Sequence, residues 1–453
     1  MLLVTHALLV PVVGPDFIED GWMLIRDDGM IDSLGPAPAP AVPDGIRILD
    51  VDGAFVAPGF VSSHSHLFTG PTRGLGADQT LYGWCDSMLG FFAHVPPELV
   101  YWCSLHGSLD FLANGVTTAF DFTDPRLPWE PMVEGRRHGG GALRPIDYTL
   151  RQIDAKADAG LRFVNAIPMD ATVGTDEEIF SRFAEVLDHS SGLDARLLLG
   201  SAVFGAVQWS PREDTAELEV EMMRRHDVIN QAHFLETREA VELQRAKFDF
   251  YDRAGALGPD MVFGHFIQTT PEIIERAAAA GSRMSWQPAS NGRLASGVAD
   301  VPAIRAAGMT IGVGLDDQAC TDVADPWQNM RIGMYQLRAL TGEPSVMSPA
   351  EMLRLHTIGS AEAIGVADRV GSLEPGKFAD FVVVDPRRPD LGPIWHPVAA
   401  YVLACGLRNL RQVYVGGELV AEGGVSLNPL AAEASAKLHE QLPRIAAEHG
   451  WPA

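Results

Sequence analysis

The stretch APGFVSSHSHLFTG, residues 57 to 70, combines an apolar run with two histidines near its end. An apolar run of this length is typical of a buried strand. Side chains at positions i and i+2 of a strand point to the same side, so His64 and His66 can reach one ion. Two histidines at this spacing arise easily by chance. The rest of the chain therefore has to supply the other ligands of a metal site.

The composition limits the class of protein and its partners. The chain has 453 residues, enough for one large domain or several ordinary ones with a sizeable core. Its hydrophobic fraction of 47% is typical of a globular protein. The formal net charge of −25 repels polyanions. We therefore expect neither nucleic acid nor an anionic membrane surface as a partner.

The cysteines and the hydropathy pattern bear on the cellular location. The four cysteines are far apart in the sequence and show no paired spacing. This predicts neither a disulfide framework nor a CxxC metal site. The N-terminal segment lacks a basic leader, and we interpret it as a first strand. No run of about 18 uncharged apolar residues suggests a membrane span. We expect a cytoplasmic protein.

The middle of the chain alternates between apolar strands and helix-like segments, which is typical of a parallel α/β sheet. Eight strands are predicted, at 59–66, 116–123, 161–168, 195–203, 228–236, 261–266, 282–288 and 309–317. Eight such units in roughly 260 residues match a (β/α)₈ TIM-type barrel. An open sheet that bound a dinucleotide would carry a GxGxxG turn after its first strand, and the sequence has none there.

Short strands with glycine and proline turns occupy both ends of the chain. We predict that they form one small flanking β-sandwich domain. The predicted domains are a composite β domain of residues 1–58 and 368–425, a barrel of residues 59–367 and a C-terminal helix or tail of residues 426–453. The expected fold class is α/β.

Further candidate ligands fall at the C-terminal ends of the predicted strands, where barrel enzymes build their active sites. His233 precedes Glu236 in AHFLET after the fifth strand. His265 ends the sixth strand, and Asp316 and Asp317 end the eighth. Three imidazoles and one carboxylate can hold a divalent ion such as Zn²⁺ and leave a position for water. Water on such an ion ionises near neutrality, and a free carboxylate such as Glu236 can carry its proton to a leaving group.

These motifs resemble the amidohydrolase superfamily, in its cytosine deaminase and atrazine chlorohydrolase-like branch. The resemblance rests on the PGFVSSHSH strand, the His-x-x-Glu of AHFLE, the GH of strand six, the GLD of strand eight and the late segment GSLEPGKFADFVVVD. It covers nearly the whole chain. The resemblance implies a hydrolase that acts on carbon–nitrogen bonds other than peptide bonds.

The resemblance also implies a mononuclear metal site. Zn²⁺ is the first choice of metal, with Fe²⁺, Mn²⁺ or Co²⁺ as alternatives. Binuclear relatives use a carboxylated lysine on strand four, and the predicted strand 195–203 contains no lysine. The implied metal ligands are His64, His66, His233 and Asp316, and the implied catalytic residues are Glu236 as proton shuttle, His265 as the group that orients substrate or hydroxide, and Asp316.

The implied reaction is attack of metal-bound hydroxide on an sp² carbon of a small aromatic or heterocyclic molecule, with loss of an amine, as in a deaminase. A urea, amide or (thio)carbamate hydrolase stays open as an alternative, because GHFIQTT and SNGRLASG resemble relatives that hydrolyse phenylureas and thiocarbamates. A chlorohydrolase is a further alternative. Two departures from the deaminase pattern, Gln268 and Asp317, fall where substrate would be contacted. A metal-stabilised binding protein without turnover is disfavoured, because a closed structural site has no use for a free base.

Substrate contacts are expected from the loops that follow several strands. Aromatic side chains there suit an apolar substrate, and amides can bond a heteroatom. The candidate contacts are Trp84, Phe92, Phe266, Gln268, Trp286, Gln287, Asn291 and Asp317. The expected partner is a small molecule, and we expect a homo-oligomer, a dimer or larger.

Overall fold

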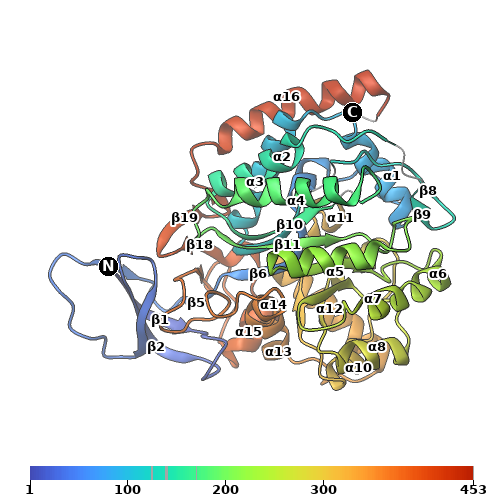
Figure 1. Ribbon diagram of the computed structural model, residues 1–453. Coiled ribbons are helices and arrows are strands. Elements are labelled where there is room, and N and C mark those ends of the chain that lie inside the picture. The colour runs from blue at the N-terminus through green and yellow to red at the C-terminus, as the bar shows by residue number, and fades with distance from the viewer. Residues whose placement is uncertain (124–125, 138–140, 170, 452–453) are drawn as a thin grey trace. The chain divides into compact units, whose positions relative to one another are not determined.

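The computed structural model describes the whole chain except residues 124–125, 138–140, 170 and 452–453. The described residues form two nine-stranded sheets, one parallel and one mixed, and a short hairpin of β8 (Met132–Val133) and β9 (Arg136–Arg137) (Figure 1). The chain divides into two compact units. One comprises residues 1–62, 109–118 and 324–429, and the other comprises residues 63–108, 119–323 and 430–453.

The parallel sheet confirms the predicted TIM-type barrel. Its strands follow the chain order and are β6 (Phe60–His66), β7 (Val116–Phe122), β10 (Arg162–Pro168), β11 (Leu198–Gly205), β12 (Ile229–Phe234), β13 (Met261–His265), β14 (Arg283–Trp286) and β15 (Ile311–Val313). The predicted eighth strand is interrupted after β15 and resumes as β16 (Asp316–Asp317). Because β16 pairs in parallel with β6, Asp316 opposite Ser65 and Asp317 opposite His66, it links the last strand to the first.

Helices follow most of the parallel strands. They are α2 (Pro97–Ala113), α3 (Asp147–Ala159), α4 (Asp176–Ser190), α5 (Thr215–His226), α6 (Val241–Ala246), α7 (Phe248–Ala254), α8 (Pro271–Ala279) and α10 (Val301–Ala306). Several begin at side-chain caps: Thr175 and Glu178 form a capping box at α4, and Thr270 caps α8 before a proline. The apolar faces of α3, α4 and α5 share one buried cluster with β10 and β11, which includes Ile153, Ile167 and Phe183.

Short helices lie at the ends of strands that carry candidate site residues. The 3₁₀ helix η1 (Leu67–Thr72) and α1 (Leu81–Phe92) follow β6, α9 (Pro288–Arg293) follows β14, and α11 (Gln318–Thr321) follows β16. These connections place side chains from several loops at the C-terminal ends of the strands, as in other barrels.

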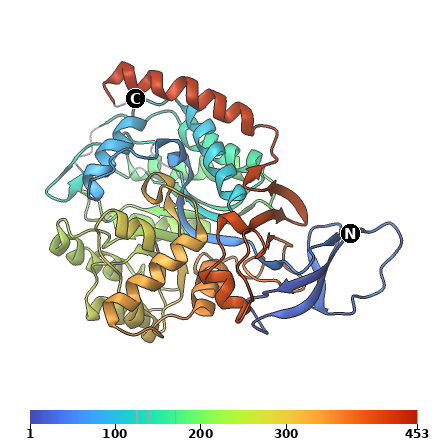
Figure 2. The same cartoon turned by 180° about the vertical axis from the view of Figure 1, so that it is seen from behind.

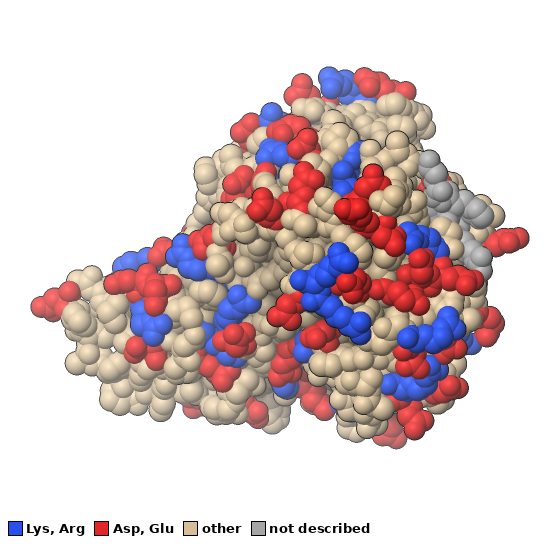
Figure 3. Space-filling view, viewed as in Figure 1, with Lys and Arg blue, Asp and Glu red and all other residues tan. Residues whose placement is uncertain are grey.

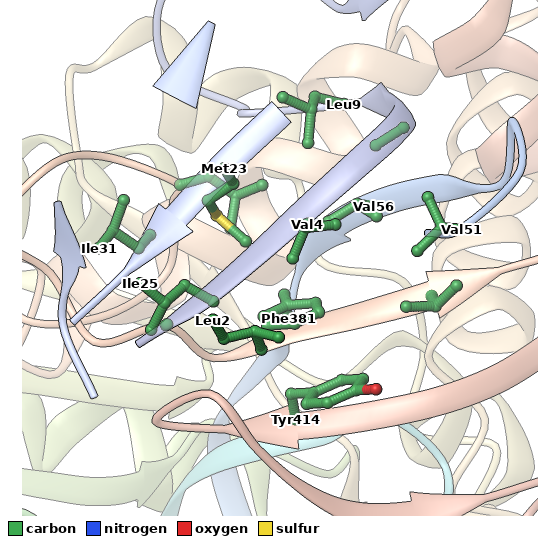
Figure 4. Close-up of a cluster of buried hydrophobic side chains, with 14 of the residues drawn as sticks. Leu2, Val4, Leu9, Met23, Ile25, Ile31, Val51, Val56, Phe381 and Tyr414 are labelled. Atoms are coloured by element: carbon green, nitrogen blue, oxygen red, sulfur yellow. The ribbon is translucent and has the colours of Figure 1, made fainter. Parts of the chain in front are cut away.

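The mixed sheet confirms that strands from both chain ends pair with one another. Its order is β20 (Val425–Ser426), β19 (Glu418–Glu422), β18 (Leu410–Val415), β17 (Phe381–Val384), β5 (Phe55–Pro58), β1 (Leu2–Leu9), β2 (Ile18–Ile25) and β3 (Ile31–Pro36), with β4 (Arg47–Asp50) on β1. The two ends meet where β17 pairs antiparallel with β5. Figure 4 shows the buried cluster of this sheet, in which Phe381 stacks on Tyr414 with ring centroids 4.4 Å apart.

The same unit contains α12 (Pro326–Thr341), α13 (Pro349–Arg354), the π-helix η2 (Leu355–Gly359), α14 (Ser360–Ala363), α15 (Pro397–Leu403) and η3 (Leu407–Asn409). The chain ends with α16 (Ala431–His449), where a helix was predicted. Figure 1 and Figure 2 both show α16 beside α2, and Lys437 Nζ lies 5.0 Å from the centre of the Trp102 ring. None of the helices in the described part of the chain has the length and hydrophobicity of a membrane-spanning helix.

The surface reflects the acidic composition. Figure 3 shows acidic and basic side chains interspersed over the visible face, with no extended basic area. Individual arginines lie among several acids; Arg276, for example, pairs with Asp249, Asp252 and Glu272. Exposed pairs of this kind contribute little to stability, because water screens them.

Candidate metal and catalytic site

Three histidine rings and one carboxylate converge at the C-terminal end of the parallel sheet. The Nε2 atoms of His64 and His233 lie 3.1 Å apart, and those of His66 and His233 lie 3.0 Å apart. Asp316 Oδ1 lies 3.6 Å from His64 Nε2 and 3.9 Å from His66 Nε2. All four side chains are buried. Strands β6, β12 and β16 thus bring together donors that are up to 252 residues apart, from His64 to Asp316.

The spacing of the nitrogens fits a shared cation. A single proton on His233 Nε2 cannot form hydrogen bonds to both His64 Nε2 and His66 Nε2. In at least one of these two contacts, the lone pairs of the two nitrogens therefore face each other at about hydrogen-bond distance. Two nitrogens that bind one tetrahedral ion at about 2.0–2.1 Å lie roughly 3.4 Å apart, close to the observed separations. The donor set therefore fits a divalent metal ion.

The protonation states of the cluster residues also fit a bound metal ion. Burial holds the pKa of His64 and of His233 well below the ordinary value and lowers that of His66 to about 4. These imidazoles are therefore neutral, the form that binds a metal. Burial raises the pKa of Asp316, but His265, His64, His66 and the hydrogen bond from Ser290 outweigh it and bring the pKa to about 2. The carboxylate is therefore charged. The chain contains a His/Asp metal-binding site.

Neighbouring side chains orient the residues of the cluster. His64 Nδ1 donates to Gln231 Oε1 at 2.5 Å, and Gln231 Nε2 donates to Ser63 O at 2.9 Å. This pairing leaves the lone pair of His64 on Nε2, which faces the cluster. Ser290 Oγ donates to Asp316 Oδ2 at 2.5 Å, so the other oxygen of Asp316 is directed to the histidines.

Two glycines leave room for His64. A Cβ on Gly264 would lie 2.9 Å from His64 Cε1, and a Cβ on Gly314 would lie 2.6 Å from His64 Cβ. Phe122 supplies an apolar wall on another side, where its ring stacks on His66 with centroids 4.9 Å apart and an angle of 16°. The metal-binding cluster is therefore closely confined by the barrel interior.

Glu236 lies beside the cluster without belonging to it. Its Oε1 lies 3.6 Å from His265 Nε2, and its buried Oε2 has no hydrogen-bond partner among the described residues. Burial raises the pKa of Glu236 to about 7; His265 opposes this shift and Asp316 adds to it. A carboxyl group in this state can accept or release a proton near neutral pH.

His265 is held in place by two amide side chains. Its Nδ1 donates to Asn291 Oδ1 at 2.9 Å, and its backbone N donates to Gln287 Oε1 at 2.8 Å. His265 and Asp316 both have left-handed backbone angles, with φ of 65° and 61°. Residues other than glycine rarely adopt this region, and such strain is concentrated at functional sites.

A cavity opens beside the cluster. His66, His233, Glu236 and Asp316 form its polar end. Its other walls are largely apolar and are formed by Phe68, Leu81, Trp84, Cys85, Met88, Leu89, Phe204, Trp209, Leu294, Asp317 and Cys320. The arrangement suits a small, mostly apolar substrate with its reactive end at the metal-binding cluster.

The predicted substrate contacts are distributed unevenly around this cavity. Trp84 and Asp317 line it. Phe92, Phe266 and Trp286 are fully buried and lie outside its lining. The amides also lie outside it: Gln268 Nε2 donates to Ser296 O, and Gln287 and Asn291 bond His265. The contact of all eight residues with a substrate stays a prediction.

Several residues around the site were not predicted from the sequence. Gln231 lies two positions before His233 on one strand, so the alternation of side chains could have indicated it. Ser290, Phe122, Phe204 and Trp209 carry no comparable signal, because only the closed barrel brings them to the site.

Residues 55–420 match the Amidohydrolase family. The chain belongs to that family. It is 28% identical over 439 residues, 94% of each chain, to 5-methylthioadenosine/S-adenosylhomocysteine deaminase of Pelotomaculum thermopropionicum. It is also 28% identical over 436 residues, 91% of this chain and 92% of the relative, to 8-oxoguanine deaminase of Pseudomonas aeruginosa.

The fold is shared with atrazine chlorohydrolase TrzN from Arthrobacter aurescens, solved in complex with zinc, at a TM-score of 0.84. The sequence identity to that structure is 21%, and the match covers 98% of this chain and 100% of the other. The family match confirms the predicted superfamily, and the likeness to this structure confirms the predicted fold. The chain is a hydrolase that acts on carbon–nitrogen bonds other than peptide bonds.

Proposed function

We propose that this amidohydrolase removes the exocyclic amino group of a purine-type heterocycle, releasing ammonia and leaving a carbonyl group on the ring. The observation that carries the proposal is the buried, unpartnered carboxyl oxygen of Glu236 beside the metal-binding cluster, in the same cavity. A site built only to hold a metal has no use for such a group. A site for hydrolysis requires one.

We propose one Zn²⁺ ion per chain, held by His64, His66, His233 and Asp316. A divalent ion held there would lower the pKa of a bound water and so would supply a nucleophile near neutral pH. Glu236 takes a proton from the water at its free Oε2 and delivers it to the departing nitrogen. Because its pKa is raised to about 7, it can act in both directions near neutral pH.

His265 stabilises charge at the reacting end of the cavity. Its Nδ1 donates to Asn291, so Nε2 is the nitrogen on the side of the reacting groups. It faces Glu236 Oε1 at 3.6 Å and Asp316 Oδ2 at 3.9 Å, and a proton on Nε2 makes it a positioned donor there. A positioned donor of this kind stabilises the charge that develops on a ring nitrogen when the adjacent carbon is attacked.

The substrate class is supported by the cavity and by the relatives. The apolar walls, with Trp84 and Phe204, suit an aromatic ring. The two sequence relatives are named as deaminases of an adenine nucleoside and of an oxidised guanine. Both names describe loss of an amino group from a purine. This favours ammonia over chloride or a larger amine as the leaving group.

The test is a substrate panel on protein of known metal content. The panel contains adenosine, 5-methylthioadenosine, guanine and 8-oxoguanine, with atrazine and an aryl urea as competing classes, and products are identified by mass. We expect ammonia in a 1:1 ratio with the oxygenated purine. Chloride from atrazine or an aniline from the urea, with no ammonia from any purine, would contradict the proposal.

Two further proposals concern the protein as a whole. We propose a homo-oligomer, a dimer or larger, which light scattering of the purified protein tests. We propose a cytoplasmic location, which is supported by the buried free thiols of Cys103, Cys320 and Cys405.

A further inference from the structure

The peptide between His66 and Leu67 is bound at both of its polar groups. His66 O accepts from Thr69 Oγ1 at 2.8 Å, and Leu67 N donates to Asp121 Oδ1 at 2.8 Å. His66 has φ −131° and ψ 80°, so the chain leaves regular strand geometry at this residue. The orientation of this peptide therefore determines the direction in which the His66 side chain leaves β6.

Asp121 is itself held by a buried cation. Lys156 Nζ lies 2.5 Å from Asp121 Oδ2 and 2.6 Å from Asn165 Oδ1. The side chains of Lys156 and Asp121 are 0% and 1% exposed. Burial raises the pKa of Asp121 and lowers that of Lys156, and their mutual attraction opposes both shifts. Strand β7, helix α3 and strand β10 thus meet at one ion pair.

The ion pair is outside the substrate cavity. Neither Asp121 nor Lys156 lines the cavity beside the metal-binding cluster, so neither can touch a substrate there. Strand β7 nevertheless acts on His66 from two sides. Asp121 binds the peptide after His66, and the next residue, Phe122, stacks on the His66 ring.

We propose that Asp121, with its charge balanced by Lys156, is a positioning residue that fixes the His66–Leu67 peptide and thereby holds the His66 ring toward the metal. This inference rests on the proposed role of His66 as a ligand. Partners that orient metal ligands typically change metal affinity by about 10–100-fold when they are removed. We expect the affinity for metal to depend on whether residue 121 can accept the hydrogen bond from Leu67 N.

Two double variants separate this role from a general contribution to folding. In Asp121→Asn with Lys156→Met, the amide oxygen still accepts from Leu67 N. In Asp121→Leu with Lys156→Met, that acceptor is lost. Neither double variant leaves an unpaired buried charge, which a single substitution would do. Asp121→Ala with Lys156→Met is the reserve variant, because it lacks the acceptor and adds no volume.

The measurement is titration of the metal-stripped proteins with Co²⁺, followed by its visible absorption, after circular dichroism has shown that each variant is folded. We expect the Asn variant to bind Co²⁺ within about threefold of wild type, and the Leu or Ala variant to bind 10–100-fold more weakly with an altered spectrum. Wild-type affinity and spectrum in the folded Leu or Ala variant would overturn the inference, as would equal weakening in the Asn variant. Failure of the wild-type protein to bind Co²⁺ would instead overturn the proposed metal site.

Discussion

Glu219 on α5 gives a prediction of how stability depends on pH. Its side chain is fully buried; Oε1 accepts from Ala206 N and Oε2 from Asn230 Nδ2, both at 2.7 Å. Burial raises the pKa of Glu219 to about 7 from an ordinary value of 4.5. Ala206 begins the loop that carries Trp209, so this carboxyl group also supports a wall of the cavity.

The direction of the pKa shift of Glu219 determines whether stability rises or falls with pH. An acid whose pKa is higher in the folded state contributes most to stability below its unfolded pKa, and the contribution is lost as pH rises through the folded pKa. A rise from 4.5 to about 7 corresponds to a loss of about 3 kcal/mol. About 2 kcal/mol of this falls between pH 5.5 and pH 8.

Glu219→Gln removes this titration. The amide keeps an oxygen for Ala206 N, and Asn230 can turn its Oδ1, which has no partner among the described residues, toward the new amino group. We therefore expect the free energy of unfolding of the variant, relative to wild type, to rise by about 2 kcal/mol from pH 5.5 to pH 8. Urea titrations followed by tryptophan fluorescence at several pH values measure this difference.

The matched control is Glu217→Gln, since Glu217 is an exposed acid on the same helix. The difference in the free energy of unfolding between this control and wild type should stay constant from pH 5.5 to pH 8. If the free energy of unfolding of Glu219→Gln also changed with pH as it does in wild type, the carboxyl group would be equally charged in the folded and unfolded states at every pH. That result would refute the inference from its burial.

Three other predictions concern the site. Gly264→Ala should weaken metal binding about 10-fold or more, because the new Cβ would press on His64; Gly258→Ala, with nothing within 4 Å of its Cβ, should leave it unchanged in the same Co²⁺ titration. Asn291→Leu should lower kcat about 10–100-fold with unchanged metal content, because His265 loses the acceptor that orients it; an unchanged kcat would contradict that role. Treatment with a strong chelator should abolish ammonia release, and Zn²⁺ should restore it; activity that survives in metal-free protein would contradict the proposed chemistry.

Much of the fold was predictable, because the barrel repeats one simple pattern. Apolar runs separated by helical segments indicated all eight strands within about three residues of their observed ends. The interruption of the last strand was missed, because it depends on pairing. Asp316 and Asp317 form a separate strand only because β6 lies beside them, about 250 residues earlier in the sequence.

A smaller part of the candidate site could be predicted from the sequence. Histidines and acids at strand ends stand out by their chemistry, so the four cluster residues and Glu236 could be named in advance. The groups that orient them could not, because residues such as Asn291 and Gln287 look identical whether they face a substrate or His265. Asp121 within the apolar strand VTTAFDFT was a visible signal, but its partner Lys156 lies on a helix 35 residues later.

The most direct test of the proposed deamination is Glu236→Gln. We expect the variant to retain the metal content of the wild-type protein, because Glu236 lies outside the group of His64, His66 and Asp316. We also expect ammonia release from the purine that wild type converts to fall about 10²–10⁴-fold, since the proton carrier is lost. Metal analysis and ammonia release measured on the same sample decide the matter. Full metal content with ammonia release within about tenfold of wild type would contradict the role of Glu236 as the proton carrier.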